Sequence, residues 1–203
     1  MNIGIDIDDT IADTYNILLK YVQEYIIHDI VKDIEKSSKD MLAQMYETKF
    51  NDESKRKGKE FFDIYYEKAV LNVEPKINAV ESIKKLKEEG NQIYLITARF
   101  PSEKFDVEES TNNWLKKNCI PYDKLILNSQ DKVTVAKKKQ IDIFIDDSIK
   151  HCTEMTNAGI KTYIMDSILN KDFNNEQIER VYSWTSLYQK IKDYKKISDE
   201  KED

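Results

Sequence analysis

The chain has 203 residues, of which 40% are hydrophobic and 34% charged, with only four Gly and three Pro. This composition is typical of a helix-rich globular core with room for an insertion, and it argues against a disordered or fibrous protein. The formal net charge of −6 argues against a surface that wraps nucleic acid, because duplex binding needs a basic stripe. With two cysteines, no basic-then-apolar leader and no long apolar run, we expect no disulfide framework and no membrane span, and therefore a cytoplasmic location.

A short apolar run near the start of the chain leads directly into acidic residues. The run from Ile3 to Ile7 predicts a strand buried in a parallel sheet, and it carries Asp6. Asp8, Asp9 and Thr10 follow at a predicted strand-to-helix turn, where open α/β sheets bind ligands. Carboxylates this close together repel one another unless a cation binds them, and Mg²⁺ prefers such oxygen ligands. Helix capping is the alternative for the last three residues, but it does not explain Asp6.

Residues 13–74 predict helices and no strand. Apolar residues recur there at three- and four-residue spacing, which is typical of amphipathic helices. The apolar stripes run from Ile17 to Ile26, from Met41 to Tyr46 and from Phe61 to Tyr66. We interpret residues 13–74 as a helical cap inserted into an α/β core formed by residues 1–12 and 75–203.

From Pro75 onward, apolar strands alternate with helical segments. The predicted strands are Gln92–Thr97, Lys124–Leu127, Asp142–Ile145 and Lys161–Met165. The predicted helices are Pro75–Gly90, Thr111–Lys117, Val133–Lys139, Ile149–Ala158 and Gln177–Tyr194, the last followed by a charged, frayed tail over residues 195–203. This alternation predicts a parallel sheet of five strands with helices on both faces.

Polar residues follow several of these strands. Because all strands of a parallel sheet end at one edge, side chains just past them meet in the same crevice. The residues that meet this condition are Asp6, Asp8, Thr97, Arg99, Asp146 and Asp147. Asp142 begins its strand and lies at the opposite edge. Lys132 opens a helix beside the crevice, whereas the other lysines of that helix are expected to be solvated at its far end.

The order and spacing of these groups resemble a known superfamily. The segment from Asp6 to Thr10 resembles the first motif of the haloacid dehalogenase superfamily, Asp-x-Asp-x-Thr. Thr97 resembles its second motif, Lys132 its third, and the pair Asp146-Asp147 its fourth. The cap is similar to the type called C1. Within the superfamily, the chain most resembles the cytosolic-type 5'(3')-deoxyribonucleotidases and their bacterial relatives, which implies a Rossmannoid fold.

The resemblance also implies roles for these residues. Asp6 would form an aspartyl-phosphate, and Asp8 would protonate the leaving oxygen and activate water. Mg²⁺ would be held by Asp6, Asp8, Asp146 and Asp147, with Asp8 contributing its backbone carbonyl and Asp147 favoured over Asp146 as the direct ligand. Phosphate would be bound by Thr97, Ala98 and Lys132. Arg99 stands where the nucleotidases have no arginine, and a further phosphate contact and a structural ion pair are equal alternatives for it.

The cap departs from the pyrimidine-type nucleotidases, which have an aromatic residue eight positions after the nucleophile. Thr14 stands there in this chain, with Tyr15 beside it. Phe62 and Tyr65 are candidates for stacking on a base, but their spacing equally suits packing within the cap.

The residues, together with what the resemblance implies, predict a Mg²⁺-dependent phosphomonoester hydrolase, and the resemblance favours nucleoside monophosphates as its substrates. A phosphatase for sugar phosphates or other small phosphorylated metabolites is the nearest alternative. A catalytically silent binding module is the alternative from another class. The expected partner is a small phosphorylated substrate, with no nucleic-acid polymer and no membrane, and a homodimer is left open.

Overall fold

The computed structural model describes residues 1–27, 41 and 52–202. Within these residues the chain divides into two compact units. One contains residues 1–12, 75–100 and 115–203, and the other contains residues 13–74 and 101–114. The predicted helix from Met41 to Tyr46 lies outside the described residues, except for Met41.

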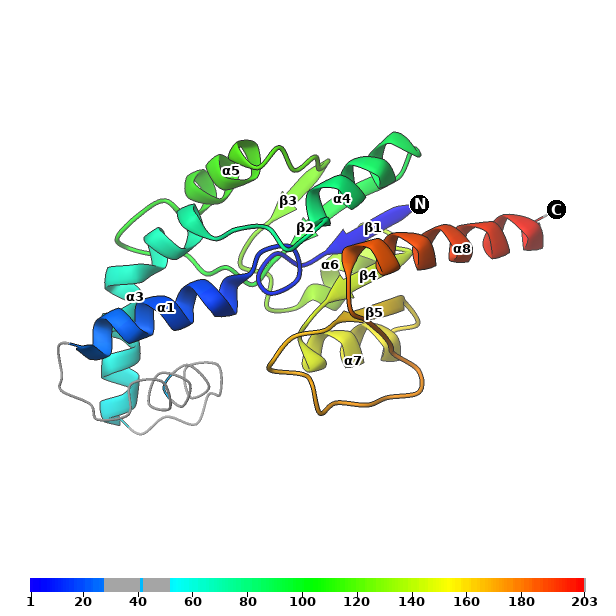
Figure 1. The fold of residues 1–203 in the computed structure, drawn as a ribbon. Helices are drawn as coiled ribbons and strands as arrows, with labels where there is room; N and C mark the ends of the chain where they lie inside the picture. The colour runs from blue at the N-terminus through cyan, green and yellow to red at the C-terminus, as the bar shows by residue number, and fades with distance from the viewer. Residues whose placement is uncertain (28–40, 42–51, 203) are drawn as a thin grey trace. The chain divides into compact units, whose positions relative to one another are not determined.

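The first unit is built on a parallel sheet of six strands, of which β1 to β5 are labelled in Figure 1. The strands are β1 (Asn2–Ile5), β2 (Gln92–Ile96), β3 (Lys124–Ile126), β4 (Ile143–Asp146), β5 (Lys161–Met165) and β6 (Glu179–Val181). They lie in the order β3-β2-β1-β4-β5-β6, and every neighbouring pair is parallel. The predicted α/β fold is therefore confirmed, with one strand more than the five expected.

The sixth strand corrects the secondary structure that was predicted for the C-terminal part of the chain. β6 occupies residues that were assigned to the start of the last helix, and Val181 lies in this strand rather than on a helical stripe. Helix α8 (Trp184–Glu202) begins three residues later and continues through the segment predicted to be frayed. A strand of only three residues, two of them charged, is defined by its pairing with β5 and not by its own pattern.

Strand β1 lies at the centre of the sheet because its residues suit burial on both faces. Ile3 and Ile5 are fully buried. Between them, Gly4 leaves room for a large neighbour, since a Cβ at this position would lie 2.8 Å from Cδ2 of Phe144 on β4. Gly4 therefore lets β1 and β4 pair closely with the Phe144 ring packed over them.

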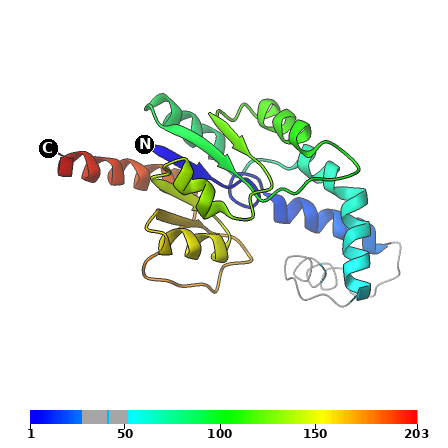
Figure 2. The same cartoon turned by 180° about the vertical axis from the view of Figure 1, so that it is seen from behind.

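Helices cover both faces of this sheet. Helix α4 (Ala79–Glu88) packs with α8 on one face, whereas α6 (Lys132–Lys138) and α7 (Ile149–Asn157) lie together on the other (Figures 1 and 2). The indole Nε1 of Trp184 donates a hydrogen bond to the carbonyl of Thr10 at 2.9 Å. This bond attaches the start of α8 to the turn that follows β1.

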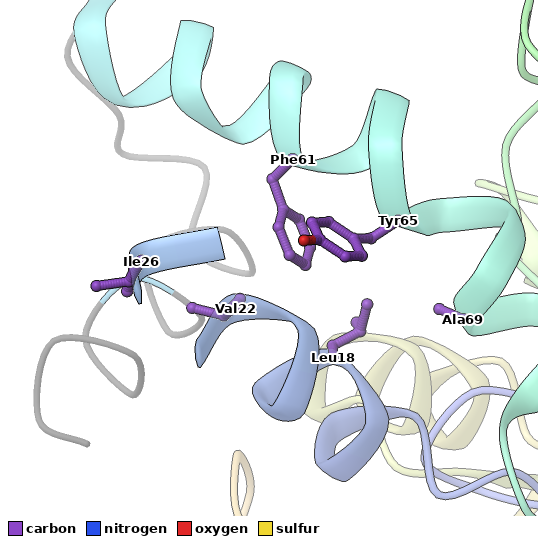
Figure 3. Close-up of a cluster of buried hydrophobic side chains, with 6 residues drawn as sticks. All are labelled: Leu18, Val22, Ile26, Phe61, Tyr65 and Ala69. Carbon is purple, nitrogen blue, oxygen red and sulfur yellow. The ribbon is translucent and has the colours of Figure 1, made fainter. Parts of the chain in front are cut away.

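The second unit is helical. Helices α1 (Thr14–Ile27) and α3 (Asp52–Asn72) pack through a buried cluster formed by Leu18, Val22, Ile26, Phe61, Tyr65 and Ala69 (Figure 3). Helix α5 (Val107–Lys117) starts in this unit, where Val107 packs against Tyr66 and Val70. Residues 101–114 therefore pack with the helices, although the sequence analysis grouped them with the α/β core.

The described helices include none that combines the length and apolar character needed to cross a bilayer.

Candidate active site

A buried lysine joins two carboxylates at the carboxyl edge of the sheet. Asp6 follows β1, Asp146 ends β4 and Lys132 begins α6. The Nζ of Lys132 lies 2.5 Å from Oδ1 of Asp6 and 2.7 Å from Oδ2 of Asp146. Because β1 and β4 are adjacent parallel strands, their ends deliver both carboxylates to the same place. Lys132 is 1% exposed, so this is a buried charged cluster and not a surface ion pair.

Asp147 adds a third carboxylate to this cluster. One oxygen each from Asp6, Asp146 and Asp147 lies within 4.8 Å of the others. Burial raises the pKa of Asp6 to about 8, since it outweighs the attraction of Lys132. Burial also raises the pKa of Asp147 well above its usual value, and the neighbouring carboxylates of Asp146, Asp9 and Asp6 add to the effect. The single ammonium of Lys132 cannot balance three carboxylates, so the donor set and its excess negative charge suit a divalent metal ion.

The two acids of the fourth motif have different environments. Burial alone would raise the pKa of Asp146, but Lys132 and His151 together hold it below its usual value. Its Oδ2 lies 3.2 Å from Nδ1 of His151, and its Oδ1 accepts from the backbone N–H of Ser148 at 2.8 Å. Ser167 Oγ lies 3.5 Å from Oδ2 of Asp147. Asp147 thus accepts fewer of these hydrogen bonds than Asp146 does, so its carboxylate has more lone pairs available to a metal.

The structure brings Asp8 and Arg99 together from segments 91 residues apart in the sequence. Nε of Arg99 donates to Oδ2 of Asp8 and Nη2 donates to Oδ1, both at 2.9 Å. A two-pronged guanidinium–carboxylate pair fixes the direction of the carboxylate as well as its charge. Of the two roles predicted for Arg99, the structure contains the ion pair, and the phosphate contact stays a prediction.

The remaining predicted phosphate-binding residues belong to the same turn. Thr97 is buried at the end of β2, and its Oγ1 accepts from the backbone N–H of Arg99 at 3.3 Å. Ala98 lies between them and is half-buried. Their contact with phosphate stays a prediction.

The predicted substrate residues of the cap lie in the helical unit. Tyr65 is 8% exposed and stacks on Tyr21 with 5.1 Å between ring centroids. Phe62 meets the ring of Phe61 edge to face, Tyr15 packs against the same cluster, and Thr14 is buried. These contacts are what packing within the unit requires, and a role of the four residues toward a substrate stays a prediction.

Sequence reasoning missed a group of polar residues around the acids. His151, which was not among the predicted site residues, contacts Asp146 from the first turn of α7. Its position five residues after Asp146, at the start of a helix after a strand, is a signal that could have identified it. Asn170 contacts Asp147 from the segment after β5 and carries no such signal.

Comparison with known proteins agrees with this geometry. The family described as 5' nucleotidase, deoxy (pyrimidine), cytosolic type C protein matches residues 1–197. A nucleotidase from Clostridium acetobutylicum is 33% identical over 190 residues, which cover 93% of this chain and 92% of the relative.

Solved structures resemble the fold. A haloacid dehalogenase-like hydrolase from Streptococcus pneumoniae aligns with a TM-score of 0.69 at 11% identity, covering 94% of this chain and 97% of that one. A structure described as a predicted phosphatase from Clostridium acetobutylicum aligns with a TM-score of 0.68 at 15% identity, covering 95% and 98% of the two chains.

The family match makes this chain a hydrolase of phosphoric monoesters, and its fold is that of haloacid dehalogenase-like proteins. Within that class, the chain belongs to the family of cytosolic type C 5'-nucleotidases.

Proposed function

We propose that this protein hydrolyses nucleoside monophosphates with Mg²⁺ through an aspartyl-phosphate on Asp6. The observation that carries the proposal is the buried cluster in which Lys132 contacts Asp6 and Asp146, with Asp147 beside them. A carboxylate next to a fixed cation and a metal-binding set of oxygens suits attack on a phosphoryl group, because the developing negative charge is offset at the site.

The first step is the transfer of the phosphoryl group to the protein. A carboxylate oxygen of Asp6 attacks phosphorus, and the bond between phosphorus and the ester oxygen breaks. The carboxyl group of Asp8 gives its proton to that oxygen, which leaves as the nucleoside hydroxyl. Thr97, Ala98 and Lys132 bind the phosphoryl oxygens during the transfer. Two hydrogen bonds of 2.9 Å each join Arg99 to Asp8. They fix the direction of the Asp8 carboxyl group, which supports its role in proton transfer.

The second step releases phosphate. The carboxylate of Asp8 takes a proton from water, the water oxygen attacks phosphorus, and the bond to Asp6 breaks. Asp6, Asp147, Asp146 and the Asp8 carbonyl would hold a Mg²⁺ ion, which would supply positive charge to offset the charge of the phosphoryl oxygens. Thr14, Tyr15, Phe62 and Tyr65 are the proposed substrate residues of the cap. The cytoplasmic location and the homodimer stay predictions.

The test is a panel of phosphomonoesters assayed with and without metal. We expect phosphate release from nucleoside monophosphates with Mg²⁺, loss of release with EDTA, and recovery when Mg²⁺ is added in excess. Faster release from sugar phosphates than from every nucleotide would contradict the proposed substrate. Release that persists in EDTA would contradict the metal requirement, and no release from any phosphomonoester would favour a silent binding module.

Substitution of Arg99 tests the role of Asp8. The Arg99→Lys variant keeps the positive charge but loses the two-pronged contact that directs the Asp8 carboxyl group. We expect kcat on a nucleoside monophosphate to fall by about 10-fold or more, because its alkoxide leaving group needs a positioned proton donor. With p-nitrophenyl phosphate, whose leaving group is stable without protonation, the single-turnover rate of p-nitrophenol release, which reports the first step alone, should change little. An equal loss on both substrates would argue against this role, and thermal unfolding of the variant checks that it is folded.

A further inference from the structure

The side-chain amide of Asn170, in the segment that joins β5 to β6, forms hydrogen bonds through both its NH₂ group and its oxygen. Asn170 is 2% exposed. Its Nδ2 donates to the carbonyl of Asp147 at 2.7 Å and to the carbonyl of Met165 at 2.8 Å. Its Oδ1 accepts from the backbone N–H of Ser167 at 3.2 Å and from Nη1 of Arg180 at 2.5 Å. Both the NH₂ group and the oxygen of the amide therefore have two partners.

The chemistry of these partners allows only one orientation of the amide. Carbonyl oxygens only accept hydrogen bonds, so the NH₂ group must face Asp147 and Met165. A guanidinium only donates, so the oxygen must face Arg180.

Arg180, on β6, is itself fixed by further acceptors. Its Nη2 donates to the carbonyls of Asn170 and Phe173, both at 2.7 Å, and its Nη1 donates to Oδ1 of Asp166 at 2.7 Å. The guanidinium thus connects the edge strand to the segment that carries Asn170.

Through Asn170, these hydrogen bonds connect to Asp147, the acid that is best placed to bind a metal. The carbonyl of Asp147 is held by Asn170, and its carboxylate lies 3.5 Å from the hydroxyl of Ser167. We infer that Asn170, oriented by Arg180, is a positioning residue that fixes Asp147 for metal binding. The inference rests on the proposed function, because it requires the metal site described there. Partners in the outer shell of a metal site change affinity by about 10- to 100-fold when they are replaced.

The experiment is calorimetric titration of the metal-free full chain with MgCl₂. In the Asn170→Asp variant, a carboxylate oxygen replaces the NH₂ group that faces the carbonyls of Asp147 and Met165, and it repels them. The Asn170→Ala variant removes the same hydrogen bonds without adding charge. We expect both variants to bind Mg²⁺ about 10-fold or more weakly than the wild type.

A matched control lies in the same segment. The Oδ1 of Asn175 accepts from the backbone N–H of Gln177 at 2.8 Å, and a carboxylate accepts equally well, so Asn175→Asp adds the same charge and should bind Mg²⁺ as the wild type does. Arg180→Lys is a second variant in case the Asn170 variants do not fold, and it should also bind more weakly because one ammonium cannot replace the planar fork.

The outcomes separate this inference from the proposed function. If the wild type binds Mg²⁺ and every folded variant at positions 170 and 180 binds it within twofold, the positioning role is overturned and the proposed metal site stands. If the wild type binds no Mg²⁺, the proposed metal site fails and the inference fails with it. Thermal unfolding in EDTA gives the stability of each metal-free variant, so a change in affinity can be distinguished from a general loss of structure.

Discussion

The Asp6→Asn variant is expected to release phosphate at least about 10⁴-fold more slowly than the wild type, because removal of a nucleophile abolishes the covalent route. An amide is a poor nucleophile and cannot form the acyl phosphate. The variant should remain folded, since the Asn side chain has nearly the shape of Asp and its oxygen can still accept from Lys132. The measurement is phosphate release from a nucleoside monophosphate, with thermal unfolding as a check of the fold.

A second measurement detects the covalent intermediate itself. Under single-turnover conditions in H₂¹⁸O, attack of water at phosphorus places the heavy oxygen in the released phosphate and leaves the Asp6 carboxylate unlabelled. Label in Asp6, measured by mass spectrometry of its peptide, would show attack at the carbonyl carbon instead. An acid-quenched reaction should contain phosphorylated protein, and this species should be absent from Asp6→Asn.

Asp142→Asn is the matched control for this variant. Asp142 precedes β4, at the opposite edge of the sheet, and its Oδ2 accepts from the backbone N–H of Asn2 at 2.7 Å. An Asn oxygen can accept the same bond, so this variant should hydrolyse substrate at the wild-type rate. Appreciable phosphate release by Asp6→Asn, or an equal loss in Asp142→Asn, would remove Asp6 from its proposed role.

The Lys132→Met variant is expected to have the largest effect on stability. Methionine fills a similar volume, but Asp6 and Asp146 lose the ammonium that lies within 2.7 Å of both. Removing one partner of a buried ion pair destabilises a protein by about 3–5 kcal/mol, because the remaining charge is buried without compensation. The free energy of unfolding of the metal-free protein, from denaturant titration, measures this loss. Lys138→Met is the control, since it changes an exposed residue of the same helix and should lie within about 0.5 kcal/mol of the wild type.

The stability lost in the Lys132→Met variant should increase as the pH rises. Lys132 holds the pKa of Asp146 below its usual value, against the effect of burial, so in the wild type the ionised form of Asp146 contributes stability at neutral pH that disappears only in acid. Without Lys132, burial raises the folded-state pKa of Asp146 above that of the unfolded chain, and it raises the pKa of Asp6 further above the value of about 8 that Asp6 has in the wild type. The variant then favours their protonated forms, whose stabilising effect is present at low pH and lost as the pH rises. The difference between variant and wild type should therefore be larger at about pH 8 than at about pH 5. A difference that is independent of pH would contradict the charge argument.

Different parts of the fold were accessible to sequence reasoning to different degrees. Strand β5 was predicted with its observed limits, and β1, β2 and β4 to within a few residues, because continuous apolar runs identify buried parallel strands. Strand β6 was missed because three residues with two charges have no such pattern. Helix α3 begins at Asp52, well before the apolar stripe that predicted it, because a polar stretch can continue a helix whose later turns are packed.

The sequence by itself determined that acids, a threonine and a lysine follow the strands of a parallel sheet. This was possible because the carboxyl ends of parallel strands meet at one edge, so position along the chain predicts position in space. Only the tertiary structure decided which of these groups touch. Lys132 contacts Asp146 as well as Asp6, Arg99 pairs with Asp8, and Asn170 holds Asp147. Such contacts depend on side-chain direction and on segments far apart in the sequence, and no periodicity of the chain encodes them.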